Sequence, residues 1–226
     1  MLKKMLMLIL IIVIPFLVLL TSTQIMVQWD SFYRYEYNQN NVVVNTGIEM
    51  EELMYVTDEI QKYLFSQRDD FAIMGTVESE NRQIFNEREI THMDDVKELF
   101  VKGMYLRNIG VLLGLLLVIL LFRMDKRALY KSLRISTFVF FAFSSVMGML
   151  FAFDFTKYFI LFHELFFRND YWVLDPTDSI LINMVPLNFF IHIAVGIIVF
   201  SIFIMLCIGL LGYKLGKIKG GRHIEG

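Results

Sequence analysis

Four long apolar runs, separated by charged segments, constrain this chain more than any other feature of its sequence. The first run predicts a membrane helix over residues 5–27, and the others occupy about 108–122, 135–153 and 189–213. A helix rises about 1.5 Å per residue and a bilayer core is about 30 Å thick, so such runs are long enough to cross it. The second run is short unless the residues before it enter the interface. The sequence therefore predicts four transmembrane helices.

Composition agrees with an integral membrane protein that is mainly all-α. Hydrophobic side chains make up 56% of the 226 residues and charged ones only 19%, which is too apolar for an ordinary soluble domain. The single cysteine, Cys207, lies inside an apolar run, so neither a disulfide framework nor a thiolate metal site is expected. A cleavable signal peptide is the alternative for the first run, but that run is longer than a usual signal sequence.

The distribution of charge predicts the topology. The segment 123–134 carries five basic residues and one acid, and short cytoplasmic loops are enriched in Lys and Arg. We therefore expect this segment and both termini in the cytoplasm, and residues 28–107 and 154–188 together outside, as a small extracytoplasmic cap. The predicted organisation in chain order is helix one with its N-terminus (1–27), the cap segment leading into helix two (28–107), helices two and three (108–153), the outer loop (154–188), and helix four with its tail (189–226).

Capping patterns predict two helices in the cap segment. Thr46 with Glu49 three residues later forms a capping-box pattern before an amphipathic stretch. Thr91 with Asp94 predicts a second start, and its apolar face continues toward helix two, so one helix is expected over about 93–122. The cap is therefore expected to be helical.

Shorter patterns add a strand and two proline-linked helix starts. The segment DFAIMGTVES (70–79) predicts a strand, which leaves an α+β cap as the alternative. Asp175-Pro176 predicts a helix start with Pro at its first position, and Pro186 is expected to open the fourth membrane helix.

Residues 151–172 are dense in aromatic side chains, with His163 among them. Ten of these 22 residues are Phe, Tyr or Trp, a composition typical of the headgroup layer of a membrane. Helical spacing places Phe159, Phe166 and Phe167 on the same side as His163. The region is either an aromatic belt, which composition alone favours, or a site for an apolar ligand.

Two of the four histidines are candidates for acid–base chemistry. The predicted topology brings His92 and His163 to the same membrane face, where two imidazoles can share general acid and base work near neutral pH. Each of them alone is more often a polar interfacial residue. His192 is expected to serve helix packing or the interface, and His223 is left out of the candidate site.

Other chemistries find little support. The H-E-x-x-H zinc pattern begins at His163 but has Phe167 in place of its second ligand, and no serine-nucleophile elbow or phosphate-binding glycine loop occurs. We expect no metal, no cofactor and no nucleic-acid partner. Asn169, Tyr171 and Asn183 are neutral hydrogen-bonding side chains suited to a polar headgroup or to a developing oxyanion.

The segment 162–190 resembles the signature of a bacterial family of four-span membrane proteins, the lipoprotein intramolecular transacylase (Lit) family. The residues that carry the resemblance are FHELFF from Phe162, NDYW from Asn169, Asp175-Pro176, Asp178, Asn183-Met184, Pro186 and Phe189-Phe190. The resemblance covers nearly the whole chain, including the histidine in the THMDD sequence at 91–95.

The resemblance implies an enzyme of the bacterial cell membrane that needs no cofactor. Its reaction moves the sn-2 acyl chain of a diacylglyceryl-cysteine lipoprotein to the α-amine of the same cysteine and gives a lyso-form lipoprotein. It implies His92 and His163 as the two catalytic histidines, facing the outer surface among membrane lipids. The alternative is a non-enzymatic membrane protein whose cap binds lipid or a partner protein. The expected substrate-binding residues are Phe159, Phe162, Phe166, Phe167, Asn169, Tyr171, Trp172 and Asn183, with Asp175 and Pro176 in supporting roles.

Overall fold

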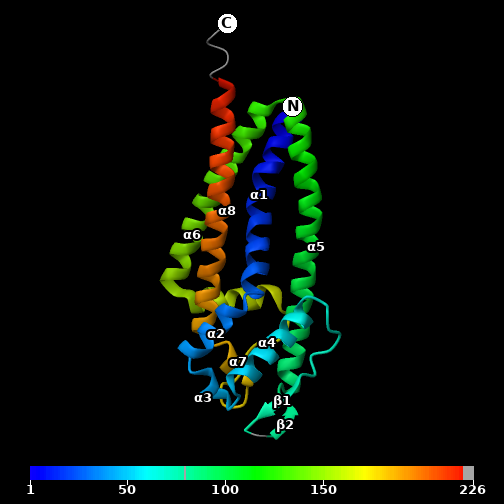
Figure 1. Cartoon of the computed structure of the whole chain (residues 1–226), viewed down its shortest axis with the longest axis vertical. Helices are drawn as coiled ribbons and strands as arrows, with labels where there is room; N and C mark the ends of the chain where they lie inside the picture. Colours follow the sequence, from blue (N-terminus) through cyan, green and yellow to red (C-terminus); the bar gives the residue numbers. More distant parts are fainter. Residues whose placement is uncertain (79, 221–226) are drawn as a thin grey trace. The chain divides into compact units, whose positions relative to one another are not determined.

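The computed structural model describes residues 1–78 and 80–220 and divides the chain into two compact units (Figure 1). We call the first the membrane unit; it contains Met1–Gln24, Tyr105–Phe153 and the chain from Gly196 onward. The second, the cap unit, contains Ile25–Met104 and Asp154–Val195. Among the described residues, four helices are long and apolar enough to cross a membrane, which confirms the predicted fold class: α1 (Leu2–Val27), α5 (Glu87–Met124), α6 (Lys126–Phe166) and α8 (Leu187–Gly220).

The membrane unit is a bundle whose apolar side chains face both inward and outward. Leu6 and Leu10 of α1 pack against Leu117 and Leu121 of α5 and against residues 128–130 of α6. Many other apolar side chains are exposed, as expected where lipid tails are the solvent. At the same end of the bundle as this cluster, Lys3 Nζ lies 3.0 Å from Asp125 Oδ2 in an ion pair.

The cap unit has its own hydrophobic core, and it is α+β. Its shorter elements are α2 (Asp30–Gln39), α3 (Val42–Thr46), α4 (Met50–Leu64), β1 (Met74–Val77), β2 (Glu80–Gln83) and α7 (Ile180–Met184). The predicted strand is confirmed over β1, which pairs antiparallel with β2. The core includes Tyr37, Leu53, Phe71, Phe85 and Met184. The polar sequence of β2 contains no strand pattern, so only the pairing reveals it.

Both capping boxes predicted in the cap segment are wrong. Thr46 lies inside α3 and donates to the carbonyl oxygen of Val42 at 2.7 Å, and α4 begins after Glu49 without a side-chain cap. Thr91 lies inside α5, which begins at Glu87 rather than near residue 93. The box that starts α5 is formed by Asn86 and Glu89. Its two bonds are reciprocal: the backbone N–H of Glu89 donates to Asn86 Oδ1 at 3.0 Å and that of Asn86 to Glu89 Oε2 at 2.7 Å.

The predicted helix start at Asp175-Pro176 is also wrong. The backbone N–H groups of Asp178 and Ser179 donate to the carbonyl oxygen of Asp175, which makes a turn. Helix α7 begins after Ser179, whose Oγ accepts from the backbone N–H of Ile182 at 3.3 Å. Pro186 immediately precedes α8, and its carbonyl oxygen accepts from the backbone N–H of Phe189, so the prediction that Pro186 opens this helix is confirmed.

Helix α6 continues past the predicted end of the third apolar run. Its backbone breaks at Asp154, where φ is −159° and ψ is 83°, and Asp154 Oδ1 accepts from the backbone N–H of Lys157 at 3.0 Å. This bond caps the second stretch of the helix in the usual N-cap manner. The outer loop predicted from residue 154 therefore begins with a helix, and that helix carries His163.

A test of the cap unit is Gly47→Ala at the end of α3. Gly47 has φ of +67°, and a Cβ atom there would lie 3.0 Å from Glu78 Cγ. A left-handed conformation costs a non-glycine residue roughly 1–2 kcal/mol, so Gly47→Ala should lower the free energy of unfolding by about that amount. Thermal denaturation in detergent measures the change.

Gly103→Ala is the matched control, because a Cβ at this helical position would meet nothing within 4 Å. We expect it to be neutral or mildly stabilising. Equal melting temperatures for the Gly47→Ala and Gly103→Ala variants would contradict the assignment of strain to Gly47.

Candidate active site

The cap unit brings His92 and His163 together. His92 belongs to α5 and His163 to α6, and their ring centroids lie 6.1 Å apart at an interplanar angle of 37°. Only 8% of His92 and 7% of His163 is exposed. The predicted meeting of the two imidazoles is thus present in the structure, and both side chains are largely shielded from water.

The hydrogen bonds of the two imidazoles differ. His163 Nδ1 lies 2.7 Å from the carbonyl oxygen of Phe159, and a carbonyl can only accept, so Nδ1 carries the hydrogen. In the neutral ring, Nε2 therefore keeps its lone pair. His92 Nδ1 is buried and has no hydrogen-bond partner among the described residues. A buried polar atom normally has one, so a ligand or water that pairs with His92 would lower the cost of its burial.

An aromatic shell surrounds His163, as the sequence predicted. Trp172 lies 4.8 Å from the imidazole between ring centroids and Phe159 lies 4.3 Å from it. Phe167 contacts both histidines, at 5.4 Å from His92 and 5.5 Å from His163. Large aromatic rings exclude water at low cost in side-chain entropy, so the shell makes the surroundings of both imidazoles apolar.

Two further phenylalanines lie at the border of this shell. Phe162 meets His163 edge to face at 5.4 Å. Phe166 packs on Phe162 at 4.8 Å rather than on a histidine, and half of it is exposed. The helical-face prediction thus identified the region, although Phe166 lies on its exposed border.

Helix α5 holds the loop that carries Trp172. Arg88 donates to the carbonyl oxygens of Asp170 and Val173, the latter at 3.1 Å, and its guanidinium lies 5.5 Å from the centroid of the Tyr171 ring. One helical turn beyond His92, Asp95 accepts from Asn169 Nδ2 at 2.8 Å. Asn169 and Tyr171, which we expected to bind substrate, therefore also fasten this loop to α5.

Sequence reasoning missed Arg88 and Asp95. They flank His92 at spacings of four and three, which places all three side chains on one face of a helix. This signal is visible only when the helix begins at Glu87. The misplaced helix start near residue 93 hid it.

Glu89 is a second positioning residue that the sequence analysis missed. Its carboxylate is 1% exposed and accepts three hydrogen bonds of 2.7 Å, from Ser179 Oγ, from the backbone N–H of Leu181 and from that of Asn86. These bonds join the first turn of α5 to the start of α7. The three hydrogen bonds offset the cost of burying the Glu89 carboxylate, which lies three residues before His92.

Three predicted residues lie in a separate group. Asn183 Nδ2 donates to the carbonyl oxygens of Pro176, at 2.7 Å, and of Ser179, at 2.9 Å. The backbone and hydroxyl of Thr177 donate to the Asp175 carboxylate, and these bonds hold the pKa of Asp175 below its usual value. In residues 1–78 and 80–220, no hydrogen bond or ring contact joins Asn183, Asp175 or Pro176 to the paired histidines. These residues hold the 175–183 turn.

The remaining histidines lie outside the pair. His192 Nδ1 is 2.9 Å from both carboxylate oxygens of Glu36, a residue that is 1% exposed, so His192 serves packing in the cap unit. His223 falls outside the described residues. Within the part of the chain that is described, no three His, Cys, Asp or Glu side chains gather closely enough to hold a metal ion.

Comparison with known proteins shows which family has this fold. The sequence model of the family described as "Lipoprotein intramolecular transacylase Lit" matches residues 8–190. The chain belongs to this family. A protein of Aquifex aeolicus (strain VF5), described only as uncharacterized, is 26% identical over 226 residues, which cover 96% of this chain and 99% of that one.

Solved structures show the same fold. The membrane integral lipoprotein intramolecular transacylase Lit from Bacillus cereus, at 24% identity, superimposes with a TM-score of 0.80 over 98% of each chain. A variant of that protein with one histidine changed to alanine gives a TM-score of 0.79 at 24% identity over 96% of this chain and 95% of that one.

Family membership confirms the predicted function class. The chain is a multi-pass membrane enzyme of the lipoprotein intramolecular transacylase family, and lipoproteins are the substrates of this family. The alternative of a non-enzymatic cap is set aside on this ground.

Glu89→Gln tests the support of the site. A glutamine amide cannot accept at both terminal atoms, so at least one donor among Ser179, Leu181 and Asn86 would lose its partner. An unsatisfied buried donor costs about 1–3 kcal/mol, and we expect the free energy of unfolding to fall by that amount. Denaturation of the purified protein measures it.

Glu87→Gln removes the same charge from an exposed position in the same helical turn, and should leave stability nearly unchanged. If Glu89→Gln and Glu87→Gln have the same melting temperature, the Glu89 bonds do not stabilise the start of α5.

Proposed function

We propose that His92 and His163 catalyse the transfer of the sn-2 acyl chain of a diacylglyceryl-cysteine lipoprotein to the α-amine of the same cysteine. The observation that carries this proposal is the pair of buried imidazoles, 6.1 Å apart, inside an aromatic shell. Two groups of this kind suit a reaction that removes a proton from one atom and delivers a proton to another.

The reaction forms a C–N bond and breaks a C–O bond. The amine nitrogen attacks the ester carbonyl, and the glyceryl oxygen leaves with one proton. Two protons leave the substrate ammonium in all, so one is released to solvent. Since nucleophile and ester belong to one molecule, no acyl-enzyme is required, and positioning supplies several kcal/mol of the barrier. The reaction therefore does not need the serine-nucleophile motif that the sequence lacks.

The tautomer of His163 favours it as the base. Its Nδ1–H donates to the carbonyl oxygen of Phe159, and this bond both exposes the lone pair of Nε2 and stabilises the imidazolium formed after proton uptake. His163 then accepts the proton of the attacking nitrogen. His92 is neutral in these apolar surroundings, so it takes up one of the two protons that leave the ammonium and gives it to the departing glyceryl oxygen.

The aromatic shell holds acyl chains and excludes water. Phe162 and Phe166 present apolar surface at 42% and 50% exposure, while Phe159, Phe167 and Trp172 enclose the imidazoles. Excluding water protects the ester from hydrolysis, the competing reaction. The lipid tails are thereby folded so that the amine meets the ester.

The site faces the extracytoplasmic side in this proposal. The argument is the positive-inside rule applied to the basic segment 123–134, which places both termini in the cytoplasm and residues 28–107 outside. The lipidated N-terminus of a bacterial lipoprotein substrate lies at that outer surface, among the membrane lipids.

Histidine variants test the mechanism. Purified full-length protein is incubated with a synthetic diacylated lipopeptide, and mass spectrometry follows the N-acylated lyso product. Loss of a general acid or base typically costs about 10²–10⁴-fold, so His92→Ala and His163→Asn should each slow the reaction by that factor. Asn at position 163 can still donate to the Phe159 carbonyl oxygen but cannot take up a proton, which separates chemistry from structure.

His192→Gln is the control, because its amide can still donate to Glu36 and the residue lies outside the histidine pair. It should retain activity. A His163→Asn variant that forms product at the wild-type rate would exclude His163 as the base.

A double-mutant cycle tests whether the hydrogen bond between Asp95 and Asn169 positions the loop that carries Trp172. Asp95→Ala and Asn169→Ala each remove the 2.8 Å bond that fastens the loop before Trp172. Small misplacements of reacting groups cost up to about 10²-fold, so we expect kcat to fall about 10- to 100-fold in each single variant and little further in the double.

Glu98→Ala is the control for this cycle, since Glu98 pairs with Lys102 on the exposed side of α5. Additive losses for Asp95→Ala and Asn169→Ala would show that the two residues act independently.

A further inference from the structure

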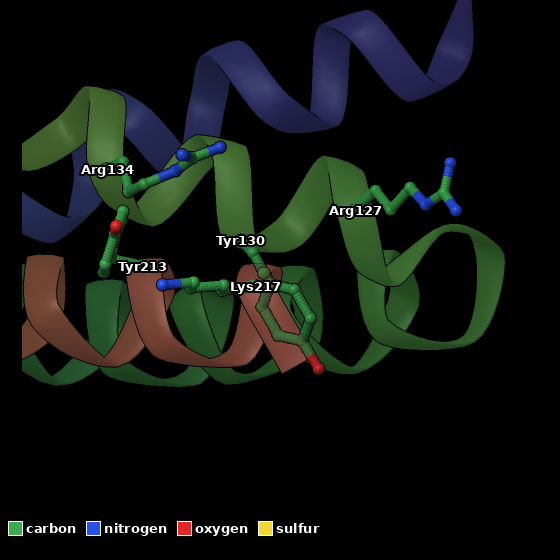
Figure 2. A pocket seen from close by; sticks show the side chains of 6 residues that line it. Arg127, Tyr130, Arg134, Tyr213 and Lys217 are labelled. Atoms are coloured by element: carbon green, nitrogen blue, oxygen red, sulfur yellow. The ribbon is translucent and has the colours of Figure 1, made fainter. Parts of the chain in front are cut away.

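The membrane unit contains a basic cavity that acyl transfer does not use. It lies between the first turns of α6 and the last turns of α8 and has a volume of about 290 Å³. Its lining residues are Arg127, Tyr130, Arg134, Tyr213, Gly216 and Lys217 (Figure 2).

Glycines of α8 create the cavity by letting the two helices approach and then diverge. A Cβ atom at Gly212 would lie 2.9 Å from Leu133 Cβ and 3.0 Å from the carbonyl oxygen of Tyr130, so only glycine fits this close contact. One turn later, a Cβ at Gly216 would lie 3.8 Å from Tyr130 Cβ, an ordinary contact distance. The hollow opens at this second glycine.

Among residues 1–78 and 80–220, the cations of the cavity have no acidic partner. In Figure 2, Arg134, Tyr213 and Lys217 lie on one side of Tyr130, and Arg127 lies on the other. The acid of the α5–α6 turn, Asp125, is engaged by Lys3 at 3.0 Å. Within the described part of the chain, neither Arg134 nor Lys217 takes part in an ion pair. Their positive charge is available to an anion.

The position of the cavity is typical of a headgroup site. Lys, Arg and Tyr at the ends of apolar helices lie at the level of lipid headgroups. On α8, just before Tyr213, Leu210 and Leu211 are 57% and 53% exposed and present apolar surface for lipid tails. A cavity with cations next to an apolar helix surface matches a molecule that has an anionic head and an apolar tail.

We propose that this cavity binds a phosphate group, supplied by the headgroup of an anionic phospholipid. The Arg134 guanidinium forms a bidentate pair with phosphate oxygens, the Lys217 ammonium adds a point charge, and the Tyr213 hydroxyl donates a further bond. The volume of about 290 Å³ lies at the lower end for small-molecule sites, so it suits a headgroup and leaves the tails outside. The bound lipid bridges the start of α6 and the end of α8.

Native mass spectrometry of the full chain in detergent micelles tests the proposal. The probes are phosphatidylglycerol, the zwitterionic phosphatidylcholine, and inorganic phosphate. A basic residue near an anionic lipid contributes about fivefold in affinity, so Arg134→Ala and Lys217→Ala should each weaken phosphatidylglycerol binding by that factor. The double variant should lose more, and added salt should reduce wild-type binding.

Lys131→Ala is the matched control, because Lys131 is exposed on the same helix, carries the same charge and does not line the cavity. Arg134→Lys should keep part of the binding, which guards against a folding defect in Arg134→Ala. If phosphatidylglycerol binding falls in the cavity variants and not in Lys131→Ala, the result supports the lipid site. If inorganic phosphate binds through the same residues and phosphatidylglycerol adds nothing, the phosphate site stands and its source is free phosphate. Equal losses in Lys131→Ala, or none in the double variant, would overturn the proposal.

Discussion

The placement of His92 depends on a buried carboxylate. Glu89 is 1% exposed and accepts from Ser179, Leu181 and Asn86, and a buried charge is tolerated only when such partners are present. The same bonds start α5 at residue 87 and join it to α7. That start sets the helical face on which Arg88, His92 and Asp95 lie. From that face, Arg88 and Asp95 bind the loop whose Trp172 packs on His163.

The cap unit builds an apolar environment around two imidazoles. Trp172 and Phe159 enclose His163, Phe167 contacts both imidazoles, and the Phe159 carbonyl oxygen selects one tautomer of His163. A reaction within one substrate molecule needs orientation, proton transfer and exclusion of water more than it needs covalent catalysis. Each histidine lies on a helix, α5 or α6, that also contributes a membrane-spanning stretch to the membrane unit. The membrane-spanning stretches and the two histidines therefore share the same two helices.

The incorrect sequence predictions have a common physical cause. The patterns at Thr46 with Glu49 and at Thr91 with Asp94 are as good locally as the box that starts α5, Asn86 with Glu89. What selects the last pattern is the packing of Glu89 against residues 179–181, which lie about 90 positions later in the chain. The Asp175-Pro176 start failed for a related reason, because Ser179 caps α7 instead. Strand β2 has no apolar alternation and exists through its pairing with β1.

The sequence by itself determined the four membrane helices, the charge pattern and the aromatic region around His163. These features follow from the hydrophobicity, charge and residue spacing of single segments. Each segment carries its own pattern, whatever the rest of the chain does. Only the tertiary structure decided that His92 and His163 lie 6.1 Å apart, that Asp95 holds Asn169, and that Asn183 donates to the backbone of the 175–183 turn. The first two contacts join residues about 70 positions apart, and the third depends on where α7 begins. Their geometry is set by how helices pack, which no local pattern encodes.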